Sequence, residues 1–322
     1  PQIIEFIAAL IEKEYAYQVG NDVYFRVHQF ADYGKLSKQN TEQLCVGVRV
    51  EVKEDKENPL DFALWKGEVE GDFWQSPWGW GRPGWHIECS ALAATYLGEH
   101  IDIHGGGLDL IFPHHENEIA QSEARYGAPF VACWVHNGLV TINKEKMSKS
   151  LGNVYDLHHL FSLCDPIVVR FYLLSHHYHM PFDFSLEGLD RAHKTYQRLC
   201  KMYETHESQM PADVPESLNS PALSKMFYFL YDNMNTQGML GALFEFLPTL
   251  SAQEMSLSKY ILTTILGLPL QLVAEKSAVV TAEVQALLEE RDQARRVKDW
   301  ARADALRDQL LQLGYEIQDK KM

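Results

Sequence analysis

The segment that decides the fold reads Ile101-Asp102-Ile103-His104-Gly105-Gly106-Gly107-Leu108-Asp109. Ile101 and Ile103 alternate with polar residues, which predicts a short strand, and three glycines follow it directly. A glycine run by itself is more often a tight turn than a binding site. At the carboxyl end of a parallel strand, however, glycines let a nucleotide approach the backbone, and Asp109 could accept hydrogen bonds from a ribose. The segment therefore predicts a nucleotide-binding edge of an open sheet.

Strand and helix patterns alternate on both sides of this segment. Such alternation is typical of a parallel sheet with covering helices. Residues 65–85, which hold five of the seven tryptophans, are instead predicted to be loop. The predicted elements before residue 153 are a helix at 3–11, strands at 22–27, 46–52, 101–104, 130–135 and 139–142, and helices after Gly84 and near His114.

The carboxyl half has a different pattern, because strand signals nearly vanish after residue 153. Apolar stripes with helical spacing cover 166–176, 186–205, 222–247 and 255–273, and a last helical unit is predicted at about 282–313. A polar linker that contains proline, 206–221, interrupts the stripes. The sequence therefore predicts an α/β part followed by an all-α part.

Composition and charge narrow the possible classes of protein. A chain of 322 residues is long enough for two or three domains with separate cores. Its net charge of −15 argues against broad nonspecific binding to nucleic acid, although a local basic face could still dock RNA. No apolar stretch approaches the ~20 residues of a transmembrane helix. The five cysteines are scattered and no export signal is recognised, so we expect reduced thiols and a cytoplasmic protein.

A thiol, an imidazole and a carboxylate lie between the predicted strands. Cys89 falls on the helix predicted after Gly84, while His114 and Glu118 are four residues apart and share a helix face. These groups suit Zn²⁺, which accepts sulfur, nitrogen and oxygen ligands in a tetrahedron. Taken alone, a buried cysteine beside a surface His/Glu pair would be the commoner interpretation. Since His115 would point about 100° away from His114, we expect either an open site with three ligands or a fourth ligand outside this chain.

A lysine pair follows the last strand predicted in the α/β part. The string Lys146-Met147-Ser148-Lys149-Ser150 continues into Leu151-Gly152-Asn153. Lysines in such a loop can close over a polyphosphate and neutralise the charge that moves onto a departing pyrophosphate. Two lysines on a surface loop are usually only solvated, but the full string is far rarer. We therefore predict that Lys146 and Lys149 are catalytic.

Three strings, in this order, carry a family resemblance: G-W-H-I-E-C-S at 84–90, H-G-G-G-L-D-L-I-F-P-H-H-E-N-E-I-A-Q-S at 104–122, and K-M-S-K-S-L-G-N at 146–153. They resemble the cysteinyl-tRNA synthetases, a family of class I aminoacyl-tRNA synthetases, and the resemblance covers essentially the whole chain. It implies activation of L-cysteine by ATP with Mg²⁺, then transfer of the cysteinyl group to the 3′-terminal ribose of tRNA(Cys). It also implies a monomer with no membrane partner.

The resemblance assigns roles to single residues as well. One zinc ion per subunit would bind the substrate thiolate, and the residues that match its ligands are Cys89, His114 and Glu118. Trp85 matches an aromatic residue that lines the amino-acid pocket. The adenosine-contacting segment includes His104, Gly106 and Asp109, and the mobile loop that serves the ATP phosphates includes Lys146 and Lys149.

The carboxyl-terminal helices would contact tRNA in this family. A cluster on the last helical pair could meet phosphates and stack on a base; it comprises Arg295, Arg296, Lys298, Trp300 and Arg302. Aspartates are interleaved with these residues, as they are on any exposed helix with ion pairs one turn apart. The resemblance favours RNA contact over that alternative.

The implied fold is α/β plus all-α: the C-terminal half of a Rossmann-like nucleotide-binding catalytic domain, followed by a helical bundle that binds tRNA. The implied parts are a connective segment at 1–64, the second half of the catalytic domain with the zinc site and lysine loop at 65–153, stem-contact helices at 154–205, a bundle of the anticodon-stem type at 206–274 and an anticodon-recognition region at 275–322.

The chain departs from the family pattern in two respects. It contains no H-x-G-H string, and the family's fourth zinc-ligand cysteine is not matched. We therefore expect that the chain starts after the first strands and helix of the family's nucleotide fold. On that expectation the chain by itself would bind zinc weakly and catalyse very little activation.

Two other interpretations remain. A ligase of the same ancestry that joins cysteine to an amino sugar in the mycothiol pathway would use the same zinc and lysine loop, but it would have no use for a tRNA-contacting segment at 282–313. A noncatalytic RNA-binding fragment would bind tRNA without zinc and without forming an adenylate.

Overall fold

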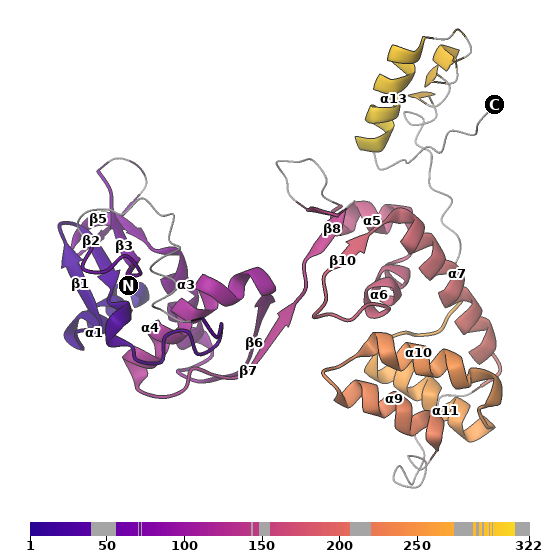
Figure 1. The fold of residues 1–322 in the computed structure, drawn as a ribbon, viewed down its shortest axis with the longest axis horizontal. Helices are drawn as coiled ribbons and strands as arrows, with labels where there is room; N and C mark the ends of the chain where they lie inside the picture. Colours follow the sequence, from indigo (N-terminus) through magenta and orange to yellow (C-terminus); the bar gives the residue numbers. More distant parts are fainter. Residues whose placement is uncertain are drawn as a thin grey trace. The chain divides into compact units, whose positions relative to one another are not determined.

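The computed structural model describes residues 1–39, 56–69, 71, 73–142, 144–147, 155–206, 220–273, 286–287, 290–291, 293–295, 297 and 299–312. The chain divides into two compact units, Pro1–Gly138 and Leu139–Met322. Figure 1 shows the order of the elements along the chain. Each unit has a hydrophobic core of its own.

The first unit contains an antiparallel sheet with the strand order β1-β2-β3-β5-β4. Its strands are β1 (Ala16–Val19), β2 (Asp22–Phe25), β3 (Phe62–Gly67), β4 (Trp74–Ser76) and β5 (Gly79–Pro83), and a 3-10 turn at Val27–Gln29 follows β2. Buried residues of β2 and β3, such as Phe25 and Leu64, pack against three helices. These helices are α1 (Gln2–Glu12), α3 (Trp85–Tyr96) and α4 (Glu116–Tyr126). The helices predicted at 3–11 and after Gly84 and the strand at 22–27 are thereby confirmed.

The prediction that residues 65–85 form a loop is wrong, because they contain the end of β3 and all of β4 and β5. The strands were not predicted because the glycines of this segment were interpreted as turn residues. A Cβ atom at Gly81 would lie 2.2 Å from the carbonyl oxygen of Lys66, and one at Gly84 would lie 1.9 Å from that of Ala63. These glycines therefore mark the close approach of two strands, whereas Gly79, with φ of +118°, begins β5 directly after the turn at residues 77–78.

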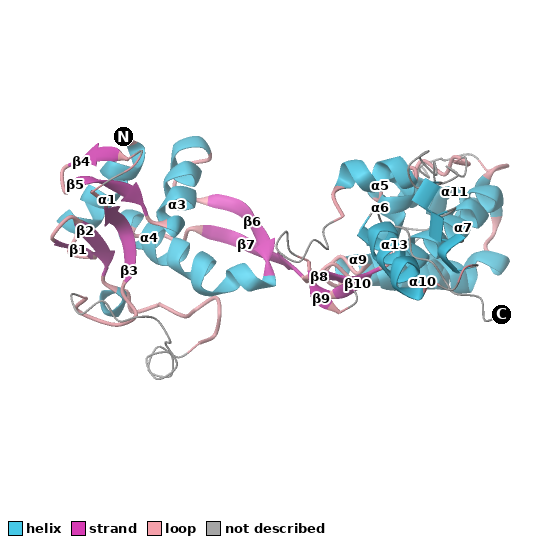
Figure 2. Ribbon diagram, turned by 90° about the horizontal axis from the view of Figure 1, so that it is seen from above, coloured by secondary structure: helices cyan, strands magenta, loops and turns pink. Residues whose placement is uncertain are grey.

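The first unit also contains a parallel pair, β6 (Ile101–Gly107) and β7 (Val131–Asn137), which are joined through α4. The expected parallel pairing is thus confirmed for these two strands, as Figure 2 shows. Two short turns precede α4, a 3-10 turn at Leu108–Leu110 and a π-turn at Ile111–His115. The helix predicted near His114 is α4 together with this π-turn.

The second unit begins with β8 (Val140–Ile142), which pairs in parallel with β10 (Phe182–Phe184) and antiparallel with β9 (Glu145–Lys146). The strand predicted at 139–142 is confirmed as β8. Only Gly138 and Leu139 separate it from β7, which is too short for the crossover of a dozen residues or more that parallel neighbours need. The strand predicted at 46–52 lies outside the described residues.

Helices dominate the rest of the second unit. They are α5 (Leu157–Leu163), α6 (Pro166–Leu174), α7 (Leu186–Tyr203), α9 (Pro221–Tyr231), α10 (Thr236–Phe246), α11 (Ala252–Tyr260) and α13 (Trp300–Gln312), with a 3-10 turn at Leu247–Thr249 and a π-turn at Ile261–Ile265. The stripe predicted at 222–247 is two helices, because Asn233 and Met234 have positive φ angles between them. Tyr196 and Tyr203 of α7 are fully buried in the core of this unit. The coarse prediction of α/β followed by helices is therefore confirmed.

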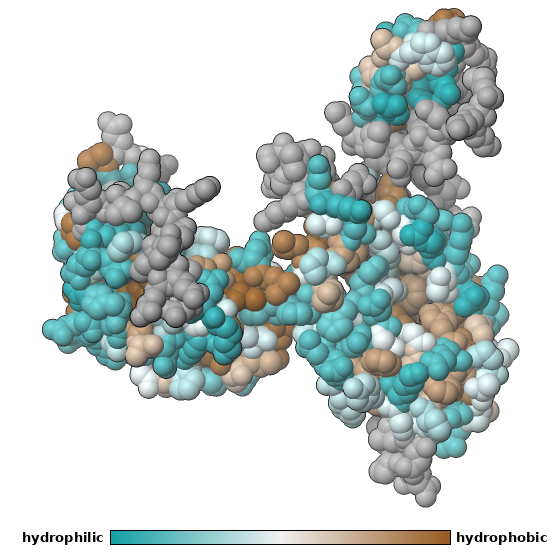
Figure 3. All heavy atoms as spheres, viewed as in Figure 1, coloured by the Kyte–Doolittle hydropathy of each residue, from teal (hydrophilic) through white to brown (hydrophobic). Residues whose placement is uncertain are grey.

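The surface of the last described helix is mainly polar. Hydrophilic residues cover most of the face of α13 that Figure 3 shows. Within the described ranges, no helix combines the length and the apolar character needed to cross a bilayer.

Candidate functional site

Three elements of the first unit bring the predicted metal ligands together. Cys89 lies on α3, His114 in the π-turn before α4, and Glu118 in the first turn of α4. One ligand atom from each of these residues lies within 4.8 Å of the other two. The two helices are joined by a buried hydrogen bond of 2.6 Å, which Ser90 Oγ donates to Gln121 Oε1. Helix packing therefore holds the three side chains at one point.

Glu118 is the least ordinary member of this trio, because its side chain is 0% exposed. Its Oε1 lies 2.6 Å from Nε2 of His114, and its Oε2 lies 3.2 Å from Nε2 of His104. Neither contact has hydrogen-bond geometry, so neither imidazole donates to this carboxylate, and its neighbour Cys89 offers only a thiol, which is a weak donor. A buried carboxylate that is so poorly satisfied is unfavourable, and a cation would offset that penalty. The donor set of sulfur, nitrogen and oxygen therefore fits a zinc ion.

Burial sets the charge of the neighbouring groups. It raises the pKa of the Cys89 thiol to about 11, with a further contribution from the Glu118 carboxylate. Burial also lowers the pKa of His86 to about 4, with a contribution from His114. Without a cation, the thiol and this imidazole are therefore neutral at pH 7. A metal ion would favour the thiolate instead, because the thiolate is the form that binds metals.

Trp85 and His86, the first two residues of α3, lie beside the trio. The ring of Trp85 stacks on His114, with centroids 4.6 Å apart, and its side chain is 60% exposed. Nδ1 of His86 lies 2.8 Å from Nδ1 of His114 and so can fix the orientation of that ring. Both residues line a cavity of about 890 Å³. Trp85 therefore lies beside the candidate metal ligands, and its role in an amino-acid pocket stays a prediction.

Two of the predicted nucleotide-contacting residues, His104 and Gly106, lie within β6, and the third, Asp109, follows it. His104 is 18% exposed and lies against both Glu118 and His115. Gly106 lies so close to the His115 ring that a Cβ atom there would be 2.7 Å from its Cε1. Asp109 lies in the following 3-10 turn and is exposed. The contacts of these residues with adenosine stay a prediction.

His115 is not grouped with Cys89 and His114 among the potential ligands. Its Nδ1 lies 2.8 Å from Nε2 of His136. Burial, followed by the effect of His104, lowers the pKa of His115 to about 3. Together with His104 and Glu118, His115 forms a second group of potential ligands whose atoms lie within 4.8 Å of one another.

The predicted phosphate-binding lysines belong to the second unit. The backbone of Lys146 lies in β9, and Lys149 lies outside the described residues. Their catalytic role therefore stays a prediction.

The predicted tRNA contacts near α13 are only partly described. Trp300 is 56% exposed, as base stacking would require. Arg302 forms an ion pair with Glu290, as does Arg307 with Asp304 at 3.1 Å. Arg295 is described, whereas Arg296 and Lys298 lie outside the described residues. Ion pairing and RNA contact both fit this surface.

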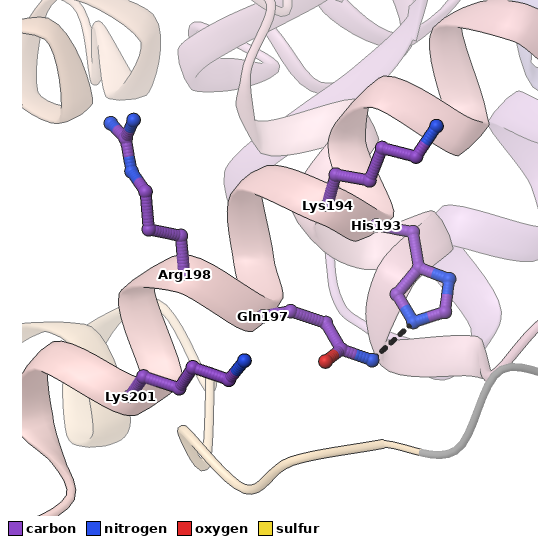
Figure 4. Close-up of a pocket in the computed structure, with 5 residues that line it drawn as sticks. All are labelled: His193, Lys194, Gln197, Arg198 and Lys201. Atoms are coloured by element: carbon purple, nitrogen blue, oxygen red, sulfur yellow. Dashed lines mark hydrogen bonds between the residues drawn. The ribbon is translucent and has the colours of Figure 1, made fainter.

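A basic surface on α7 was not predicted. Figure 4 shows the side chains that line a cavity of about 230 Å³ along this helix: His193, Lys194, Gln197, Arg198 and Lys201. Gln197 donates a hydrogen bond of 2.7 Å to the carbonyl oxygen of Val273. Lys194, Arg198 and Lys201 follow at helical spacing, which was the signal available in the sequence. Such a row of cations can contact phosphate groups.

Glu116 and Asn117 were also missed, although they stand inside the motif that supplied His114 and Glu118. Glu116 is 0% exposed and accepts hydrogen bonds from the backbone N–H groups of Gly34 at 2.9 Å and Ser37 at 2.8 Å. Asn117 Oδ1 accepts a hydrogen bond of 2.5 Å from the hydroxyl of Tyr33. These residues anchor the segment after β2 to the start of α4, next to the metal ligands.

Known proteins match this chain over most of its length. A family model described as the class I (C) tRNA synthetase catalytic domain matches residues 1–194, and one described as the cysteinyl-tRNA ligase anticodon-binding domain matches residues 278–322. A cysteine–tRNA ligase of Caldicellulosiruptor saccharolyticus is 45% identical over 98% of this chain and 72% of its own length. The cysteine–tRNA ligase of Geobacillus thermodenitrificans is 46% identical over 96% of this chain and 70% of its own length. That of Thermodesulfovibrio yellowstonii is 43% identical over 99% of this chain and 74% of its own length.

Proposed function

We propose that this chain, which belongs to the cysteine–tRNA ligase family of class I aminoacyl-tRNA synthetases, selects L-cysteine through a zinc ion held by Cys89, His114 and Glu118. It is a ligase that uses ATP to join cysteine to tRNA. The observation that carries the proposal is the fully buried carboxylate of Glu118, which lies between two imidazoles that do not hydrogen-bond to it and beside the thiol of Cys89.

Selection is difficult because serine and cysteine are nearly the same size, so a pocket that selects by shape could separate them only weakly. Zinc, when bound, would supply a centre that stabilises a thiolate far better than an alkoxide. The three side chains leave at least one position of the tetrahedron for the substrate sulfur. Trp85, stacked on His114 and 60% exposed, can cover the bound amino acid.

Activation needs no covalent bond between enzyme and substrate. The carboxylate of cysteine must be aligned with the α-phosphate of ATP, and the charge of the departing pyrophosphate must be neutralised. We assign the second task to Lys146 and Lys149, with Mg²⁺ on the phosphates, and adenosine contacts to His104, Gly106 and Asp109. The product would be cysteinyl-adenylate, whose acyl group passes to the 3′-terminal ribose of tRNA(Cys).

Contacts with tRNA are assigned to the helical part of the chain. The row of cations on α7 and the surface around Trp300 are the candidates among the described residues. In this assignment residues 65–153 are the second half of a Rossmann-like catalytic domain, preceded by a connective segment. The helices after residue 154 successively contact the stem and the anticodon of tRNA(Cys).

The two alternatives have less support. A ligase for an amino sugar would not need an anticodon-binding segment, and residues 278–322 match such a domain. A purely RNA-binding protein would not need a converged set of sulfur, nitrogen and oxygen ligands.

The test is cysteine-dependent exchange of pyrophosphate into ATP, followed by charging of tRNA. We expect exchange with cysteine to exceed exchange with serine by about 10⁴-fold, and cysteine to be transferred to tRNA but not to an amino sugar. Removal of zinc with a chelator should abolish exchange. Equal exchange with serine, or unchanged exchange after zinc removal, would contradict the proposal.

A further inference from the structure

We propose that His104, His115 and Glu118 form a second binding site for a divalent transition-metal ion, separate from the site at Cys89, His114 and Glu118. Two imidazoles and one carboxylate suit Zn²⁺, Co²⁺ or Ni²⁺ better than Mg²⁺ or Ca²⁺, which prefer oxygen ligands. One ligand atom from each of the three residues lies within 4.8 Å of the other two.

The geometry between His104 and Glu118 is that of two ligands of one ion. Nε2 of His104 and Oε2 of Glu118 are 3.2 Å apart, but the contact lacks hydrogen-bond geometry. In a tetrahedral site with metal–ligand distances near 2.0–2.1 Å, neighbouring ligand atoms are about 3.4 Å apart. The side chain of Glu118 is 0% exposed, so this oxygen cannot be satisfied by bulk water. A cation between the two groups would satisfy both.

The two carboxylate oxygens of Glu118 lie toward different histidines. Oε1 lies 2.6 Å from Nε2 of His114, and Oε2 lies toward His104. A carboxylate can bridge two metal ions in this way, as in two-metal sites with ions about 3.5–4 Å apart. The first ion would lie toward the sulfur of Cys89, and the second toward β6.

His114 and His115 are supported in the same manner. Nδ1 of His114 lies 2.8 Å from a nitrogen of His86, and Nδ1 of His115 lies 2.8 Å from Nε2 of His136. A histidine that binds a metal usually engages its other ring nitrogen in such a contact, which fixes the tautomer and the ring orientation. When Nδ1 of His115 donates, its Nε2 carries a lone pair for a metal. His114 and His115 thus each have a supporting histidine.

Gly106 makes room for the second site. A Cβ atom at this position would lie 2.7 Å from Cε1 and 3.0 Å from Nε2 of His115. The strand β6 therefore approaches the His115 ring closely, which brings His104, two residues earlier on the same strand, to the same ring at a centroid distance of 4.8 Å. Glycine at position 106 is explained by this approach independently of any nucleotide.

The experiment is a titration of the metal-free full chain with Co²⁺ alone, followed by absorption spectroscopy. We expect two equivalents to bind. The first should produce a thiolate-to-cobalt charge-transfer band from Cys89, and the second should increase only the d–d bands. His115→Gln and His104→Asn, which change different elements, should each weaken the second equivalent at least about tenfold and keep the charge-transfer band, which also shows that the variants are folded.

His100→Gln is the matched control, because His100 is exposed and belongs to neither group of potential ligands. It should still bind two equivalents. Binding of a single equivalent by the unaltered chain, or of two by both ligand variants, would overturn the second site. The two proposals can also fail separately. If the titration produced no charge-transfer band but His115→Gln still lost one equivalent, the result would contradict the proposed zinc–thiolate centre and support the second site.

Discussion

Replacing Cys89 with serine should reduce bound zinc to background and lower cysteine-dependent pyrophosphate exchange by more than about a hundredfold. The hydroxyl of serine is a much poorer ligand for zinc than a thiolate, while its size leaves the packing of α3 unchanged. His114 and Glu118 would then be the remaining ligands of the trio. Elemental analysis of the purified variant measures the zinc, and isotope exchange measures the activity.

Cys133→Ser is the matched control for this substitution. Cys133 is an exposed cysteine on β7 and belongs to neither group of potential ligands among the described residues. We expect its zinc content and exchange rate to equal those of the unaltered protein. A Cys89→Ser protein that retained one zinc ion and discriminated against serine would contradict the proposed ligand set.

Replacing Glu118 with methionine should have opposite effects on stability and on metal binding. In the metal-free protein the substitution removes a buried carboxylate to which neither neighbouring imidazole donates a hydrogen bond. A buried polar group that is poorly satisfied costs about 1–3 kcal/mol of stability, and an apolar side chain of similar volume removes that cost. We therefore expect a higher free energy of unfolding for metal-free Glu118→Met, but no further stabilisation when zinc is added.

Unfolding in urea, with a chelator and with zinc, measures both effects. Glu116→Met is the matched control, because Glu116 is equally buried but accepts hydrogen bonds from the N–H groups of Gly34 and Ser37. Its replacement should lower stability by roughly 2–5 kcal/mol, since those donors lose their acceptor. If Glu118→Met lowered the stability of the metal-free protein as much as Glu116→Met does, Glu118 would be a structural residue instead of a metal ligand.

Local spacing explains what could be predicted of the candidate site. The interval of four between His114 and Glu118 places both on one side of a helix, and a helix after Gly84 places Cys89 near the start of α3. The parallel pair β6 and β7 followed from the alternation of strands and helices around α4. Each of these predictions depends on residues that are close in the sequence.

What was missed depends on contacts between distant residues. The supporting contacts of His114 and His115 come from His86 and His136, which lie 28 and 21 residues away. The strands β4 and β5 were hidden because glycines resembled turns, although Gly81 and Gly84 permit close strand approach. The pairing of β8 with β10 joins segments about forty residues apart, and no local pattern specifies that pairing.

The measurement that tests the central claim most directly is the absorption of the protein loaded with one equivalent of Co²⁺, recorded while L-cysteine or L-serine is added. If the metal binds the substrate sulfur, cysteine should strengthen the thiolate-to-cobalt charge-transfer band, because a second thiolate joins that of Cys89. Serine should leave the band unchanged. An identical response to both amino acids, or no response to cysteine, would contradict selection by a metal–thiolate bond.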